Sequence, residues 1–313
     1  VLGELVCRAV ITSPSNQIMN PQLGWVYMPH STVFRGVEGG ASLRLNALGM
    51  NNDPIKQTKQ RKMLVLGDSM TEALQVPRAT NYVAQLNQLR PDFQWVNGGQ
   101  SGVGPAHYLA LAARYQAVGA SHLLVVFSRG DGSNLLRKAV VEKKTPDGIQ
   151  IRVKPSSKDR LKQTLEPILH RSALATHLGR RFLPIIKGFI APAQGPIQAW
   201  QEPKKHRPII QRRLAAVLRE LKRDFVVHAA YIPELTYHKG STSHERDWEE
   251  ELFAAACAEV QVPMTRFVKP LTQRYLDEGQ PGHGFANYRV GIGHLNPRGH
   301  ATVAKTLAKA VPR

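Results

Sequence analysis

The chain has 313 residues, of which 42% are hydrophobic, and carries a formal net charge of +19. This length and composition are typical of a globular protein with one large domain or two small ones. The sequence contains no run of about 18 apolar residues, so no segment is expected to cross a bilayer. Its two cysteines, Cys7 and Cys257, lie far apart and fit neither a disulfide framework nor a metal knuckle.

The positive charge is concentrated in one stretch. Residues 132–224 hold 21 Lys and Arg against 7 Asp and Glu, a net charge of +14. Within it, residues 134–207 are rich in proline and show no clear helical or strand period, so we interpret them as an insertion. The insertion is either an ordinary solvated face or a binding surface for an anionic membrane, an acidic glycan or an acidic protein. The candidate contact residues are Arg180, Arg181, Lys187, Lys204 and Lys205.

Part of the insertion, residues 179–190, mixes bulky apolar residues with cations, as membrane-surface segments do. Pro184 and Gly188 argue against a regular amphipathic helix there, so a buried hairpin or a partly ordered loop is the favoured interpretation. Nucleic acid is not expected as a partner, because no binding motif or aromatic stacking array accompanies the charge.

The N-terminal residues 1–61 form an extension that is expected to be strand-like and to pack on the domain. Glycines and prolines divide it into short apolar pieces, and residues 57–62 are predicted to be a polar linker. Because the sequence starts at Val1, we expect a leader or a membrane anchor upstream of it.

From residue 62 onward, short apolar strands alternate with helices. This pattern predicts an α/β domain over residues 62–313, with a parallel sheet of about five strands covered by helices on both faces. Asn296 and Pro297 are a typical N-cap and first residue for the last helix. The expected strands are 63–66, 93–96, 122–127, 225–231 and 264–268, and the expected helices are 81–89, 105–118, 209–221, 247–260 and 297–311.

A candidate nucleophile follows the first of these strands. The tripeptide Gly67-Asp68-Ser69 places a serine where the chain leaves the carboxyl end of a strand, the edge at which open α/β sheets bind ligands. A serine held there can attack a carbonyl if a base reaches it. The tripeptide alone is equally compatible with an ordinary turn in which Asp68 bonds the backbone. A candidate base, His294, is expected in a loop before the last helix.

The order of these motifs resembles the SGNH/GDSL hydrolase family, whose fold is a three-layer, flavodoxin-like α/β/α domain. A glycine-rich loop follows the second strand, and a Gly-Asp turn follows the third. The resemblance implies that Ser69 is the nucleophile, that His294 is the general base, and that the backbone N–H groups of Ser69 and Gly102 form the oxyanion hole. The extension is similar to that of extracytoplasmic, membrane-anchored members, with Gly24-Trp25, Pro29, Asn46 and Gly49.

Two positions depart from the family's pattern. Gly130 stands where the family has an asparagine that donates to the oxyanion, and Gly291 stands where it has the triad aspartate. One lost oxyanion donor costs on the order of 10²–10³ in turnover, and a lost orienting acid costs about 10⁴ in the serine proteases. Candidate substitutes are a backbone carbonyl to orient His294, and Asn134 or Arg129 as the donor to the oxyanion.

The sequence therefore supports two hypotheses. The favoured one is a catalytically degenerate hydrolase that serves as an extracytoplasmic accessory or scaffolding subunit at a membrane or membrane complex. The alternative is a weak serine esterase or acyltransferase that acts on a carbohydrate or lipid through Ser69 and His294. No cofactor is expected. No metal is expected either, because no carboxylate joins His283, His294 and His300 at ligand spacing.

Overall fold

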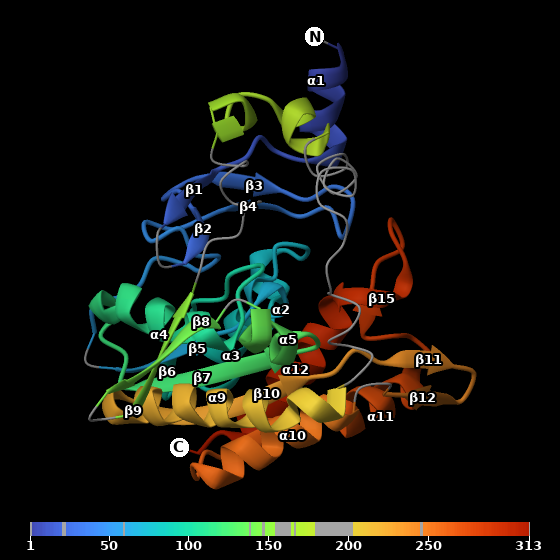
Figure 1. Cartoon of the computed structure of the whole chain (residues 1–313). Coiled ribbons are helices and arrows are strands. Elements are labelled where there is room, and N and C mark those ends of the chain that lie inside the picture. The colour runs from blue at the N-terminus through green and yellow to red at the C-terminus, as the bar shows by residue number, and fades with distance from the viewer. Residues whose placement is uncertain are drawn as a thin grey trace.

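The computed structural model places a five-stranded parallel sheet at the centre of the chain (Figure 1). The strand order is β13-β10-β7-β5-β6, and the three middle strands are buried on both faces. The prediction of a parallel α/β sheet of about five strands is confirmed. The strands are β5 (Arg61–Leu66), β6 (Phe93–Asn97), β7 (His122–Ser128), β10 (Val226–Ile232) and β13 (Met264–Arg266). The described residues are 2–20, 23–58, 60–137, 139–145, 148–153, 164–165, 167–178, 203–244 and 247–312.

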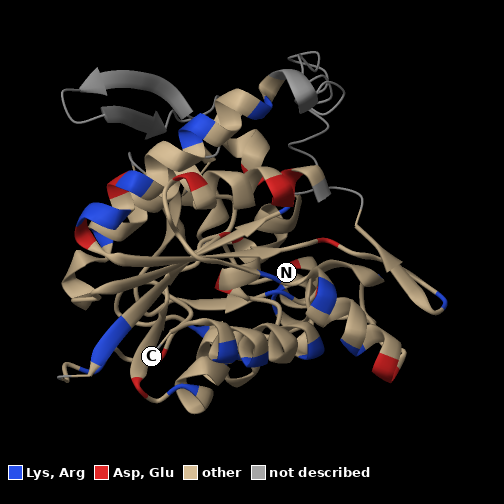
Figure 2. Cartoon of the chain, turned by 90° about the horizontal axis from the view of Figure 1, so that it is seen from below, with Lys and Arg blue, Asp and Glu red and all other residues tan. Residues whose placement is uncertain are grey.

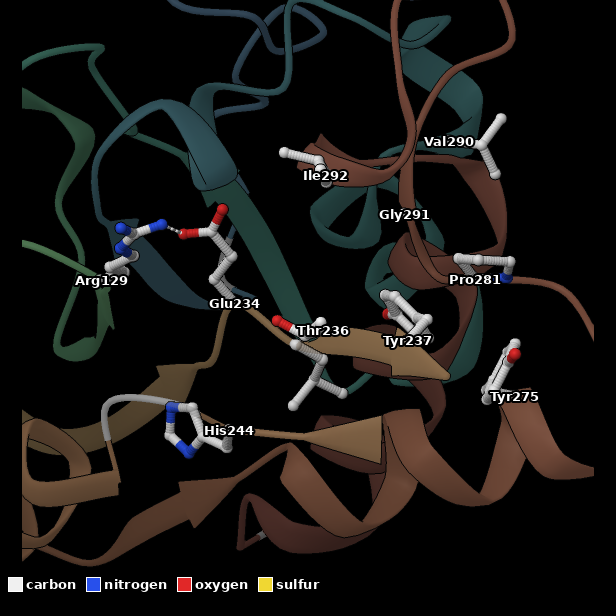
Figure 3. A pocket seen from close by; sticks show the side chains of 11 residues that line it. Arg129, Glu234, Thr236, Tyr237, His244, Tyr275, Pro281, Val290, Gly291 and Ile292 are labelled. Carbon is white, nitrogen blue, oxygen red and sulfur yellow. Dashed lines mark hydrogen bonds and ion pairs between the residues drawn. The ribbon is translucent and has the colours of Figure 1, made fainter. Parts of the chain in front are cut away.

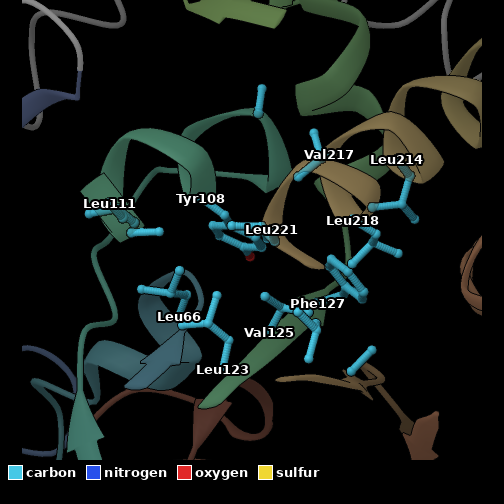
Figure 4. Close-up of a cluster of buried hydrophobic side chains, with 14 of the residues drawn as sticks. Leu66, Tyr108, Leu111, Leu123, Val125, Phe127, Leu214, Val217, Leu218 and Leu221 are labelled. Atoms are coloured by element: carbon cyan, nitrogen blue, oxygen red, sulfur yellow. The ribbon is translucent and has the colours of Figure 1, made fainter. Parts of the chain in front are cut away.

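Two hydrophobic layers hold the helices to the sheet. On β7, Leu123, Val125 and Phe127 face one layer, while Leu124 and Val126 face the other, as the period of a strand requires. The first layer lies under α4 (Pro105–Arg114), α9 (Pro203–Asp224) and α10 (Asp247–Glu259) (Figure 4). The second lies under α3 (Tyr82–Leu89), α11 (Val268–Glu278) and α12 (Pro297–Ala310). The domain is therefore three-layered, as predicted.

Several elements differ from the prediction. The first strand begins at Arg61, so the expected linker ends at Gln60. Helix α9 begins at Pro203 and contains Pro208, which the sequence pattern had placed before the helix. The insertion is not wholly irregular, because β8 (Ala139–Thr145) pairs with β9 (Gly148–Val153). Elements that the pattern did not predict are α2 (Ser69–Glu72), α5 (Asp131–Arg137), α11, β11 (Thr236–His238), β12 (Ser241–Ser243), β14 (His283–Gly284), β15 (Val290–Leu295), η2 (Arg78–Thr80) and η3 (Gln116–Val118).

The basic residues of α9 are largely engaged by the protein itself. Arg219 pairs with Glu259 at 2.5 Å, Arg213 donates to the carbonyl of Leu135, and Lys222 donates to the carbonyl of Val260. Figure 2 marks the positions of basic and acidic residues, and α9 carries both kinds, with Glu220 and Asp224 among the cations near its end. The candidate contacts Arg180, Arg181 and Lys187 lie outside the described residues, as do the side chains of Lys204 and Lys205.

The N-terminal extension packs over the domain as expected and consists mainly of two hairpins (Figure 1). Its elements are α1 (Leu2–Val6), the π-helix η1 (Cys7–Ile11), β1 (Gln17–Asn20), β2 (Gly24–Tyr27), β3 (Thr32–Phe34) and β4 (Ser42–Arg44). Residues 167–178 of the insertion join it, because Glu4 accepts hydrogen bonds from the N–H groups of Ala173 and Leu174. Among the described residues, no helix is both long and apolar enough to span a membrane.

Candidate active site

Ser69 is the first residue of the short helix α2, at the carboxyl end of β5. Asp68 is the N-cap of this helix, and its Oδ1 accepts from the N–H of Met70 at 2.9 Å. Its Oδ2 accepts from Ser128 Oγ at 2.6 Å, which ties the nucleophile turn to the end of β7. Asp68 is thus a hydrogen-bonded residue of the turn, as expected, while Ser69 is partly exposed to solvent.

The glycine-rich loop after β6 is bonded to the same turn. The N–H of Gln100 donates to the carbonyl of Gly67 at 3.0 Å, and Asn97 Nδ2 donates to the carbonyl of Thr71 at 2.8 Å. A side chain at Gly99 would lie 2.3 Å from the backbone nitrogen of Glu72, so only glycine permits this approach. Gly102, a candidate oxyanion donor, follows in the same loop, where it is exposed and has a φ of +78°.

His294 lies in strand β15, which corrects the expectation that it sits in a loop. Strand β15 packs against α2, so the histidine and Ser69 are carried by neighbouring elements. Burial raises the pKa of Asp68, and the nearby His294 opposes that rise.

The carboxylate of His294 comes from the N-terminal extension. Glu38 Oε2 lies 2.8 Å from His294 Nδ1, and Glu38 Oε1 accepts from the His294 backbone N–H at 3.0 Å. An ionised carboxylate can only accept, so Nδ1 carries the proton and Nε2 is left as the basic nitrogen. This is the role of the acid in a Ser–His–acid triad.

Glu38 is ionised in this setting. Burial alone raises the pKa of Glu38, but the hydrogen bonds and charge of His294, with the charge of Arg35, outweigh burial and hold the pKa below its usual value. Arg35 comes from the same hairpin and donates to Tyr27 Oη at 3.1 Å. The hairpin thus supplies both the acid and a nearby cation that favours its charged form.

The turn that carries Glu38 joins β3 to β4 and is fixed to the domain. Asn287 Oδ1 accepts from the N–H of Gly39 at 3.0 Å, and Asn287 Nδ2 donates to the carbonyl of Gly36 at 2.9 Å. A side chain at Gly39, whose φ is +82°, would lie 1.9 Å from the carbonyl oxygen of Gln75. Glycine at position 39 therefore lets the turn press against the domain and hold Glu38 in place.

Gly130 and Gly291, the two positions that depart from the family's pattern, differ in the space around them. Gly130 has a φ of +96°, and a side chain there would meet no atom within 4 Å. Its N–H donates to Glu249 Oε2 at 3.1 Å, and Glu249 Oε1 accepts from the N–H of Gly132 at 2.8 Å. Gly291 has a φ of +82°, and a side chain there would face Tyr237 and Pro281.

The suggested substitutes for the missing groups have other partners. Arg129 is ion-paired with Glu234. Asn134 Nδ2 donates to the carbonyl of Val103 at 3.4 Å and lies 3.5 Å from Asp131 Oδ1. The suggested backbone carbonyl is not what orients the His294 ring, because Glu38 holds it.

The other two C-terminal histidines are buried and neutral. His283 Nδ1 lies 2.6 Å from Tyr237 Oη, and His300 Nδ1 accepts from the N–H of Tyr82 at 3.3 Å. Burial lowers the pKa of His283 to about 4 and that of His300 to about 3. Among the residues that the structure describes, no group of three potential metal ligands is found.

The parallel sheet, the Gly-Asp-Ser turn after β5 and the histidine before α12 follow the order that the resemblance to the SGNH/GDSL hydrolases implies. Several solved structures are similar to the chain. A lipolytic G-D-S-L protein from Veillonella parvula has 13% identity over 81% of this chain and 99% of its own, with a TM-score of 0.44. The acetyl xylan esterase AlAXEase has 14% identity over 80% and 100%, with a TM-score of 0.45.

A lipase/acylhydrolase from Enterococcus faecalis has 12% identity over 80% of this chain and 94% of its own, with a TM-score of 0.43. These identities describe a likeness of fold. No protein-family model matches the sequence, and the comparison with curated proteins found no match.

Proposed function

We propose that this protein is a serine ester hydrolase or acyltransferase with Ser69, His294 and Glu38 as its triad. The observation that carries the proposal is the contact between Glu38 and His294. Glu38 supplies the carboxylate that the sequence around His294 lacks. The missing triad acid was the principal reason to regard the site as degenerate, and this contact removes that reason.

The reaction follows from the roles of the three side chains. Ser69 Oγ attacks the ester carbonyl carbon while His294 Nε2 takes the hydroxyl proton, and Glu38 stabilises the imidazolium that forms. The backbone N–H groups of Ser69 and Gly102 donate to the oxyanion of the tetrahedral intermediate. When that intermediate collapses, the ester C–O bond breaks and His294 gives its proton to the leaving alcohol.

The second half of the reaction releases the acyl group from Ser69. Water or an acceptor hydroxyl attacks the acyl-enzyme, with His294 again taking the proton, and Ser69 Oγ leaves with a proton returned from His294. Water gives hydrolysis, and an acceptor alcohol gives acyl transfer. With Gly130 in place of an asparagine, the site has two backbone donors and no side-chain donor from that position, so we expect modest turnover.

The first test is hydrolysis of p-nitrophenyl acetate by the wild-type protein and the Ser69→Ala variant. We expect Ser69→Ala to reduce the rate to the background of the buffer. Ser241→Ala, an exposed serine in β12, is the matched control and should keep the wild-type rate. Equal rates for the wild-type protein and Ser69→Ala would refute the proposal.

A second candidate function, docking to an anionic membrane, is supported by a different surface. Among the described residues, the extension and residues 167–178 together expose eight large apolar side chains: Leu2, Leu5, Val6, Val10, Ile18, Val37, Ile168 and Leu178. Apolar side chains beside cations such as Arg8 and Arg171 suit the headgroup region of an anionic bilayer. An accessory or scaffolding role and an extracytoplasmic location stay predictions.

The docking proposal is tested by sedimentation with vesicles at physiological salt. We expect the protein to sediment with vesicles that contain phosphatidylglycerol more than with vesicles of phosphatidylcholine alone. Leu5→Asp should weaken this binding, because it places a charge in the apolar surface. Absence of binding to both kinds of vesicle would exclude the membrane as the partner.

A further inference from the structure

A pocket of about 510 Å³ is lined by residues that are close in the chain to candidate site residues (Figure 3). One wall contains Arg129, which immediately precedes Gly130, and another contains Ile292, two residues before His294. The first residues after β10 and the strand β11 form the floor, including Glu234 and Tyr237. The pocket is thus lined by the elements that carry the candidate site residues Gly130 and His294, and its volume suits a small-molecule ligand.

The charges of Arg129 and Glu234 in this pocket cancel, and His244 also lines it. Arg129 Nη1 is ion-paired with Glu234 Oε2, and both side chains are partly exposed, at 44% and 25%. Arg129 would repel a cationic ligand and Glu234 would repel an anionic one, so this pair favours neither. The pair still offers hydrogen bonds to a neutral ligand, because the guanidinium carries five N–H groups and the carboxylate has a second oxygen.

The two tyrosines of the pocket present their rings rather than their hydroxyls. Tyr237 Oη accepts from the N–H of Gly282 at 3.2 Å and contacts His283 Nδ1, and Tyr275 Oη donates to the carbonyl of His238 at 2.8 Å. The ring centroids are 5.0 Å apart in an edge-to-face arrangement. The hydroxyls are thus used by the protein, and the rings form a rigid carbon surface that exposed Ile292 extends.

We propose that this pocket binds a neutral sugar ring, which is the alcohol half of the substrate. A pyranose has hydroxyls around its rim, which suit the Arg129–Glu234 pair, and apolar C–H faces, which suit the tyrosine rings. An alkyl chain would leave the hydrogen-bonding capacity of the ion pair unused in the complex, at a cost in affinity. The inference rests on the proposed function, since it makes the substrate an O-acylated neutral carbohydrate whose ester carbonyl lies at Ser69.

Binding is measured without catalysis, on the Ser69→Ala protein. The probes are methyl glucopyranoside, methyl glucuronide and 1-hexanol, titrated by NMR. We expect saturable millimolar binding of the neutral glycoside, at least fivefold weaker in Glu234→Gln and in Tyr275→Leu. Leu276→Ala is the matched control, because Leu276 is exposed on the same helix as Tyr275 and does not line the pocket.

Each outcome decides the inference. The inference is supported if both Glu234→Gln and Tyr275→Leu weaken glycoside binding. Two variants are used because a single one could weaken binding merely by disturbing the fold. Binding of 1-hexanol alone, preference for the glucuronide, or glycoside binding that neither variant changes would overturn it. Because the measurement needs no turnover, glycoside binding without Ser69-dependent hydrolysis would refute only the proposed function. Ser69-dependent hydrolysis without glycoside binding would refute only the sugar site.

Discussion

Glu38 and His294 are separated by 256 positions in the chain, and their side chains meet at 2.8 Å. The carboxylate approaches the histidine from a hairpin of the N-terminal extension rather than from the strand that carries His294. The extension is therefore part of the candidate active site. Any change that lifts the hairpin from the domain also takes the acid away from the histidine.

Removing the carboxylate of Glu38 should impair catalysis more than folding. We expect Glu38→Ala and Glu38→Gln to lower kcat for p-nitrophenyl acetate by about 10²–10⁴, because His294 loses the group that fixes its tautomer and stabilises its charged form. The check is steady-state kinetics beside a thermal unfolding curve. Val37→Ala alters an exposed neighbour in the same turn and serves as the control.

A kcat unchanged in Glu38→Ala would show that the observed contact has no catalytic role. The double variant Glu38→Ala/Gly291→Asp tests whether an aspartate at the family's triad position can replace Glu38. It should not restore activity, because a side chain at position 291 faces Tyr237 and Pro281 and the φ of +82° strains any residue but glycine there.

Asn287 should act as a positioning residue for Glu38. Its amide bonds both Gly36 and Gly39, one on each side of Glu38, so Asn287→Ala removes two hydrogen bonds from the turn. We expect kcat to fall about tenfold and the free energy of unfolding to fall by only about 1–2 kcal/mol, since each such bond contributes about 1 kcal/mol.

The activity measurement is made across pH for Asn287→Ala, with Tyr288→Phe as the control in the same loop. The contacts with His294 help to hold the pKa of Glu38 below its usual value, so a loosened Glu38 should take up a proton at a higher pH, and the acid side of the kcat/KM profile should move to higher pH. A loss of stability with an unchanged pH profile would instead mean that Asn287 is merely structural.

The alternation of strands and helices could be predicted from the sequence because it depends on local periodicity. The run Met63–Leu66 and the cap at Asn296 are recognisable within a few residues, and the structure places both as expected. Helix α11 was missed because the apolar residues of Met264–Val268 continue into it and obscure the end of β13.

The acid of the site was beyond a local search. The sequence near His294 holds no carboxylate, and the family's pattern places the triad acid only close to that residue. One feature of the sequence does point to Glu38. It is a charged residue in a glycine-rich turn, and functional side chains often lie on such loops. Its partner depends on how the extension packs, which periodicity does not specify.

The protein should lose stability as the pH falls below neutrality. Burial lowers the pKa of His228 and His283 to about 4 and that of His300 to about 3, against a usual value of 6.5. Between pH 6.5 and about 4 the unfolded chain therefore binds protons that the folded chain does not. The free energy of unfolding should fall with decreasing pH, by about 1.4 kcal/mol per pH unit for each histidine.

Urea unfolding at pH 7.5, 6.5 and 5.5 measures this slope. His228→Leu should make the slope shallower by about one histidine, because His228 bonds only Thr265 at 2.9 Å among its described side-chain contacts. Stability that stays constant from pH 7.5 to 5.5 would contradict the assignment of these histidines as buried and neutral.

Gly130→Asn should raise turnover, because it restores a side-chain donor at the position where SGNH hydrolases have one. The space at Gly130 is open, and asparagine tolerates positive φ better than most residues, although +96° still strains it. We expect kcat for p-nitrophenyl acetate to rise about tenfold, less than the 10²–10³ that one well-placed donor is worth, and the protein to lose on the order of 1 kcal/mol of stability. Gly130→Ala carries the same backbone strain without a donor, so its kcat should not rise. An equal change in both variants would show that the oxyanion does not lie within reach of position 130.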